Sequence, residues 1–169
     1  MRGNSRRELR VLSIDPASRG FGFCVLEVAG RLVDWGTRSA RSRHNRNERC
    51  VAIVKKLIEE YQPDVLVTEK CDGHGWRRHI RVRELIDALV NLAHEQKIKA
   101  RQFTQKEVRA AFGVDEATTK HDIARAIANR FPELEPALPD RRKAGDNEAH
   151  HERTFSAIGL AVTFWHERK

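Results

Sequence analysis

Apolar and polar positions alternate along the chain with two periods, and together they predict an α/β order of elements. Five short segments have the residue types and length of β-strands: 10–14, 21–27, 31–37, 65–69 and 98–103. Ala29-Gly30 reads as a hairpin turn between the second and third of them. Helical spacing of apolar residues marks two further segments, 45–61 and 81–96.

The last third of the chain is predicted to be helical. Thr104 and Glu107 have the spacing of a capping box, so a helix begins there and runs to about Gly113. Thr119 and Asp122 open a second helix, which continues through residue 130. Three prolines then mark a loop: Pro132, Pro136 and Pro139. Asp146 or Asn147 caps a final helix that extends to about residue 165.

This order predicts a mixed sheet with helices on both faces. Three meandering strands come first, and βαβ units follow. A right-handed crossover through residues 45–61 allows the first and fourth strands to lie side by side in parallel. Asp15 and Glu69 end these two strands, so they are expected at one edge of the sheet. Because neighbouring strands are about 4.8 Å apart, the two carboxylates can share divalent metal ions.

Length and composition limit the class of protein. A chain of 169 residues, 40% hydrophobic and 33% charged, fits one globular domain, here residues 9–169 after a basic arm at 1–8. No apolar run approaches the roughly 18 residues of a membrane span. Three cysteines without metal spacing favour a reducing compartment. We therefore expect a cytoplasmic protein, nucleoid-associated or viral, with no membrane partner, and an organellar location stays open.

A formal net charge of +8 suits a nucleic-acid backbone, although charge alone is equally compatible with a merely basic protein. The basic residues cluster at 38–49, 76–83 and 141–143. Candidate nucleic-acid contacts from the last two clusters are Trp76, Arg77, Arg78, Arg81, Arg141, Arg142 and Lys143. Trp76 could stack on a base, or it could simply anchor its loop.

Four ordered stretches resemble the RuvC-type Holliday junction resolvases of the ribonuclease-H-like nuclease superfamily. The first is Leu12-Ser13-Ile14-Asp15-Pro16-Ala17-Ser18, and the second is Pro63-Asp64-Val65-Leu66-Val67-Thr68-Glu69. The third combines Val108-Arg109-Ala110-Ala111-Phe112-Gly113 with Thr119-Lys120-His121-Asp122-Ile123-Ala124. The fourth is Ser156-Ala157-Ile158-Gly159-Leu160-Ala161-Val162-Thr163. The match covers nearly the whole chain.

The resemblance implies a ribonuclease-H-like, five-stranded mixed sheet of order 3-2-1-4-5 with helices on both faces. It also implies four metal-binding groups, Mg²⁺ or Mn²⁺ with two ions per site, a homodimer, and paired nicking of four-way DNA junctions. Asp15 and Glu69 match the family's acidic positions, and Lys120 matches a lysine that contacts phosphate. The helix at 81–96 is a possible dimer interface, although core packing explains its apolar stripe equally well.

The last helix departs from the family pattern. Two acids, or a histidine and an acid, usually stand three residues apart just before the Ala/Leu-rich run. Here that place holds Arg153, Thr154, Phe155 and Ser156. At about 100° per residue, Glu148 and His151 fall on the sheet-facing side defined by the apolar residues of the helix. We therefore predict Glu148 and His151 as the remaining catalytic ligands, with Asp146 and Glu152 in reserve.

The predicted reaction is phosphodiester hydrolysis with two metal ions. One ion, held by Asp15 and the last-helix group, activates water, and the other, held by Asp15 and Glu69, stabilises the leaving oxygen. Simpler interpretations stay open: Asp15 as a turn cap, Glu69 in an ion pair, and Asp146 and Glu148 as complements to the helix dipole. Another nuclease of this fold acting on RNA or an RNA–DNA hybrid remains an alternative. So does a non-catalytic nucleic-acid-binding relative, which the missing acids would favour.

Overall fold

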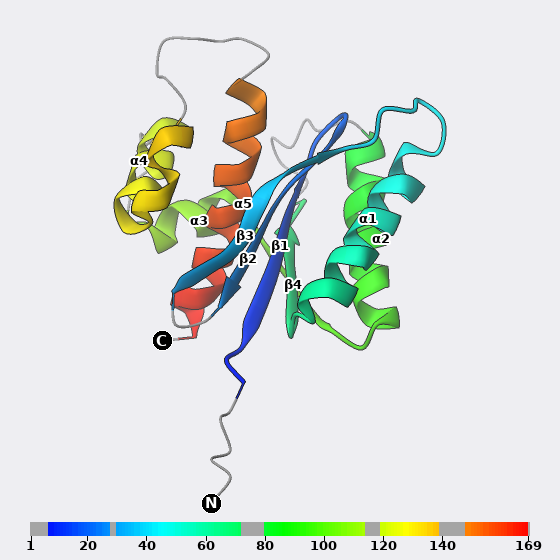
Figure 1. Cartoon of the computed structure of the whole chain (residues 1–169), viewed down its shortest axis with the longest axis horizontal. Coiled ribbons are helices and arrows are strands. Elements are labelled where there is room, and N and C mark those ends of the chain that lie inside the picture. The colour runs from blue at the N-terminus through cyan, green and yellow to red at the C-terminus, as the bar shows by residue number, and fades with distance from the viewer. Residues whose placement is uncertain (1–6, 28–29, 72–79, 114–118, 139–147, 169) are drawn as a thin grey trace, which may run out of the picture.

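A five-stranded mixed sheet forms the centre of the protein in the computed structural model (Figure 1). The structure describes residues 7–27, 30–71, 80–113, 119–138 and 148–168. The strands are β1 (Arg10–Pro16), β2 (Gly20–Glu27), β3 (Arg31–Ser39), β4 (Val65–Glu69) and β5 (Lys99–Phe103). Their order is β3-β2-β1-β4-β5, which confirms the predicted 3-2-1-4-5 sheet.

Strand directions follow the connections between strands. The meander β1-β2-β3 is antiparallel, while β4 pairs in parallel with both β1 and β5. Helix α1 (Arg46–Tyr61) carries the chain from β3 to β4, and α2 (Ile80–Glu95) precedes β5. Both β1 and β4 are buried along nearly their full length, as expected for central strands covered on both faces.

Helices cover the two faces of the sheet unequally. Figure 1 shows α1 and α2 on one face. The opposite face carries α3 (Gln105–Ala111), α4 (Lys120–Arg130) and α5 (Glu148–Glu167). Along β1 the side chains alternate: Val11 joins the hydrophobic core under α5, whereas Leu12 and Ile14 join the core under α1 and α2. The sheet therefore has a separate apolar layer on each side.

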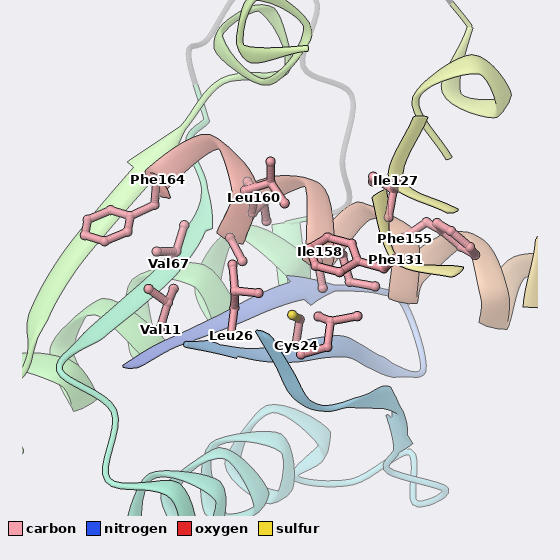
Figure 2. Close-up of a cluster of buried hydrophobic side chains, with 14 of the residues drawn as sticks. Val11, Cys24, Leu26, Val67, Ile127, Phe131, Phe155, Ile158, Leu160 and Phe164 are labelled. Atoms are coloured by element: carbon pink, nitrogen blue, oxygen red, sulfur yellow. The ribbon is translucent and has the colours of Figure 1, made fainter. Parts of the chain in front are cut away.

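Helix α5 contributes more buried residues to the core on its face than any other element. Its buried residues Phe155, Ile158 and Phe164 pack with Val11, Leu26 and Val67 from the sheet, as Figure 2 shows. Ile127 and Phe131 of α4 extend the same cluster. The predicted sheet-facing positions Phe155, Ile158 and Val162 are all at most 3% exposed, which confirms that part of the helical analysis.

Helix ends agree with the predicted caps. Thr104 and Glu107 form a reciprocal capping box at α3, and Thr119 and Asp122 do the same at α4. The predicted proline loop contains a short 3₁₀ helix, η1 (Pro132–Ala137). Its first proline fits because a helix's first residues have no intrahelical partner for their N–H groups. Asp146, Asn147 and Pro139 lie outside the described residues.

Helix α2 buries its apolar stripe in the core of its own chain. Leu85, Leu89 and Leu92 belong to the core under α1 and α2. Core packing thus accounts for this stripe, and the homodimer stays a prediction. No helix in the described part of the chain is long and apolar enough to cross a membrane. The single domain over 9–169 and the basic arm at 1–8 also stay predictions, since residues 1–6 lie outside the described part.

Candidate active site

Asp15 and Glu69 occupy equivalent places on neighbouring parallel strands. The register pairs Ile14 with Thr68, so Asp15 and Glu69 are the next residues on each strand. Both side chains point to the face covered by α5, because they follow Val11 and Val67 at even spacing. Asp15 is 2% exposed and Glu69 is 5% exposed. The predicted juxtaposition of the two strand ends is confirmed, while the roles of the two carboxylates remain predictions.

The backbone of α5 lies directly against the sheet beside Asp15. Asp15 pairs with Gly22 across the antiparallel β1–β2 ladder. A Cβ atom at Gly22 would lie 2.3 Å from the carbonyl oxygen of Arg153. Only a glycine at this position allows so close an approach of helix to strand.

A hydrogen bond fixes the register of α5 along β1. The Ser13 hydroxyl donates to the carbonyl oxygen of Ala157 at 2.6 Å, in the buried interior. Arg153 lies four residues before Ala157, about 6 Å along a helix, and Asp15 lies two residues beyond Ser13, about 6.6 Å along a strand. These rises match, so Arg153 is placed over Asp15.

The residue that α5 presents to Asp15 is therefore a cation. Arg153 Nη1 lies 3.4 Å from Asp15 Oδ2, and the side chains are 32% and 3% exposed, respectively. In the sequence, Arg153 marks only the absence of an expected acid. The signal that identifies it is the pairing of Gly22 with Asp15, which brings the helix backbone to this point of the sheet.

Glu69 is oriented from the opposite side by two glutamines. Gln105 Nε2, in the first turn of α3, donates to Glu69 Oε1 at 3.2 Å. Gln102 Nε2 on β5 donates to the Glu69 carbonyl oxygen at 3.2 Å. The capping box that starts α3 therefore also positions Gln105 against Glu69. Sequence reasoning found the cap but not this contact.

Cys71, two residues after Glu69, lies near charged side chains of both signs. Burial raises the pKa of the Cys71 thiol, while the Arg83 guanidinium acts to lower it and the carboxylates of Asp87 and Glu69 act to raise it. Arg83 and Glu69 therefore both lie near Cys71. Arg83 belongs to the basic cluster seen in the sequence, so one member of that cluster lies near Cys71, two residues after Glu69.

Asp15 and Glu69 fit one divalent cation. Mg²⁺ commonly takes one or two carboxylates and completes its shell with water and phosphate. Among the residues that the structure describes, no cluster contains three potential histidine, cysteine, aspartate or glutamate ligands. On the α5 side of Asp15, where a second ion was expected, the contact is made by the Arg153 guanidinium. The described residues thus do not fit the second ion.

The last-helix candidates do not join the carboxylate pair within the described part of the chain. His151 is exposed, because the turn of Arg153 already lies over the end of β1 and earlier residues extend beyond it. Glu152 makes an ion pair with Lys120 at 3.0 Å. Glu148 begins α5, but its side chain lies outside the described residues, as does Asp146. Their predicted metal-binding roles remain untested.

Few of the predicted nucleic-acid contacts can be placed. Lys120 opens α4, and its side chain is 59% exposed while it pairs with Glu152. Arg81 is half-buried in the first turn of α2, where its carbonyl oxygen accepts from Asn47 Nδ2 at 2.9 Å. The other candidates lie outside the described residues: Trp76, Arg77, Arg78, Arg141, Arg142 and Lys143.

Known proteins resemble this chain in sequence and in fold. No protein-family profile matches the chain. The crossover junction endodeoxyribonuclease RuvC of Synechococcus sp. (strain WH7803) is 24% identical over 166 residues, covering 95% of this chain and all of the relative. The structure of Thermus thermophilus RuvC superposes with a TM-score of 0.73 at 17% identity, covering 95% of this chain and 96% of that one. The yeast mitochondrial Holliday junction resolvase gives 0.66 at 13% identity, covering 94% and 78%.

The sheet order and the carboxylates at adjoining strand ends define a protein with the ribonuclease-H-like fold. The chain is similar to RuvC over nearly its full length, in sequence at 24% identity and in fold. This confirms the resemblance seen in the four sequence stretches. The last helix departs from the family pattern at Arg153, and this is the residue that contacts Asp15.

Proposed function

We propose that the protein is a divalent-metal-dependent endonuclease that resolves four-way DNA junctions. The observation that carries the proposal is the pair of buried carboxylates, Asp15 and Glu69, side by side at the ends of parallel strands. A RuvC of Thermus thermophilus with a similar fold, at a TM-score of 0.70 and 17% identity, is known in complex with a Holliday junction substrate. The net charge of +8 suits a polyanionic substrate.

Asp15 and Glu69 would hold Mg²⁺ or Mn²⁺. When bound, such an ion stabilises charge on the oxygens of the phosphate that is cut. The protein's own contribution is orientation: Gln105 holds the Glu69 carboxylate, and the Ser13–Ala157 hydrogen bond fixes α5 beside Asp15. Arg153 adds positive charge beside Asp15, where a phosphate approaches.

Paired cutting of a junction determines the oligomeric state that we propose. Two symmetric nicks across a junction need two active sites, so the working form is a homodimer.

Lys120 contacts the DNA backbone once Glu152 releases it, and the basic residues around 76–81 and 141–143 extend the contact. The protein acts in the cytoplasm or wherever its DNA is held. A histidine ligand such as His151 would favour Mn²⁺ over Mg²⁺.

One observation favours a second function, a junction-binding protein that does not cut. Arg153 occupies the α5 position facing Asp15, and a guanidinium there neutralises a carboxylate that metal chemistry requires. In this alternative the fold and the basic surface bind branched DNA, and the carboxylates only stabilise the structure.

A cleavage assay separates these functions. Wild type, Asp15→Asn and Glu69→Gln are incubated with Mg²⁺ or Mn²⁺ and a four-way junction, a linear duplex or an RNA–DNA hybrid. Exposed Glu135→Gln on η1 is the matched control for loss of a carboxylate. We expect symmetric junction nicks from wild type and Glu135→Gln, and at least a hundredfold loss in the other two variants. Junction binding without cutting in either metal selects the non-catalytic alternative, and equal cutting of hybrid and junction excludes a resolvase.

A further inference from the structure

The residue of α5 that contacts Asp15 carries the wrong charge for a metal ligand. A second metal ion on this side of Asp15 would need a further anionic or neutral ligand from that helix. The helix instead places a guanidinium 3.4 Å from Asp15 Oδ2. Arginine stays protonated at all working pH values, so this charge cannot be removed by deprotonation.

Arg153 is held in this place by the packing of the backbone. The helix backbone at Arg153 rests on Gly22, and Ser13 Oγ binds the carbonyl oxygen one turn later. Thr154 and Phe155, the two residues that follow Arg153, are buried, at 6% and 3% exposure. The helix therefore cannot rotate Arg153 away from Asp15 without exposing apolar side chains.

The geometry also leaves Arg153 open toward a substrate. Its side chain is 32% exposed, whereas that of Asp15 is 3% exposed. A guanidinium carries five N–H donors in a planar fork, so it can bind a carboxylate on one edge and a phosphate on another. A phosphate at Asp15 would thus meet a fixed positive charge on its α5 side.

We propose that Arg153 replaces the second metal ion of this centre. The site then holds one divalent ion, between Asp15 and Glu69, and the Arg153 guanidinium contacts a non-bridging oxygen of the phosphate. This inference rests on the proposed nuclease function and specifies its metal content: one ion per chain instead of the two expected from the sequence.

Counting bound Mn²⁺ tests the inference without relying on activity. Wild type, Arg153→Asp and Arg153→Met are titrated with Mn²⁺, and bound ions per chain are measured by electron paramagnetic resonance. Arg125→Asp is the control for charge reversal, since Arg125 is exposed on α4. We expect one ion in wild type, Arg153→Met and Arg125→Asp. We expect two in Arg153→Asp, where a carboxylate replaces the cation. Circular dichroism melts confirm that each variant is folded.

Junction binding without divalent metal provides the second readout. Arg153→Met is expected to bind a four-way junction about tenfold more weakly, with the salt slope reduced by about one, because one phosphate contact is lost. A purely structural Arg153 would leave both quantities unchanged, which would overturn its contact with phosphate.

The outcomes separate this inference from the proposed function. Two Mn²⁺ ions in a wild type that cuts junctions overturn the inference and leave the nuclease intact. One ion in both wild type and Arg153→Asp also overturns it, because Arg153 would then not determine the ion count. No bound ion and no cutting in wild type overturns the nuclease itself.

Discussion

Replacing Gly22 by alanine tests whether close contact between α5 and the sheet builds the site. The added Cβ would lie 2.3 Å from the Arg153 carbonyl oxygen, and ordinary contact requires roughly 3.5 Å. Helix and strand must therefore separate by about 1 Å. Overpacking of this kind costs roughly 1–3 kcal/mol. For a domain of this size, about 2 kcal/mol lowers the melting temperature by about 4–8 °C.

Gly159→Ala is the matched control, with the opposite expected sign. Gly159 lies on the same helix, and its added Cβ would meet Val108, Ile127 and Phe112 at ordinary van der Waals distances of 3.6–3.9 Å. Alanine is favoured over glycine in a helix interior by up to about 1 kcal/mol. We therefore expect Gly159→Ala to raise the melting temperature.

Thermal melts and junction cleavage together decide the outcome. In Gly22→Ala, Arg153 shifts relative to Asp15, and a misplacement of about 1 Å can cost about a hundredfold in rate. Cleavage should thus fall in Gly22→Ala and persist in Gly159→Ala. The reasoning is refuted if Gly22→Ala melts within 1 °C of wild type and cuts at its rate, since the helix would then not depend on this glycine.

Three further predictions concern groups around the sheet. Gln105→Leu should weaken Mn²⁺ binding by about tenfold, because it removes the donor that orients Glu69, and titration of bound Mn²⁺ would detect it. Tyr61 donates to Asp34 Oδ2 at 2.6 Å, and this bond together with burial raises the pKa of Tyr61 from 10.0 to about 12. Its stabilisation is complete below pH 10 and lost as the pH rises through 12, so Tyr61→Phe should abolish that loss in melts; an unchanged alkaline profile would contradict it. The hydrogen bond from Arg10 lowers the pKa of Glu27, so Glu27→Gln should destabilise the fold at neutral pH and less in acid, where wild type loses the same stabilisation; equal destabilisation at both pH values in urea titrations would disprove the assignment.

Local patterns predicted the sheet and its helices because each depends on residues near in sequence. The runs ending in Asp15 and Glu69 have the composition of buried strands, and Thr104 and Thr119 cap helices through contacts three residues away. The crossover rule then placed Asp15 beside Glu69. These features required no knowledge of how α5 sits on the sheet.

Local sequence patterns could not predict which residue of α5 lies against Asp15. Helical periodicity gives the face that turns inward, and it correctly selected Phe155 and Ile158. It does not give the position of the helix along the strands, which is set by Gly22 and by the Ser13–Ala157 hydrogen bond. His151 was therefore expected at the carboxylates, whereas the residue that reaches Asp15 is Arg153.

The ion pair between Asp15 and Arg153 joins residues 138 positions apart in the chain. During synthesis on the ribosome, Asp15 and Glu69 emerge long before α5, so a growing chain has the carboxylates without their guanidinium. The face of the sheet with Val11, Leu26 and Val67 also stays uncovered until α5 docks. Such an exposed apolar face favours aggregation of incomplete chains. Completing the core and completing the active site are therefore the same late event, and a truncated product would gain neither.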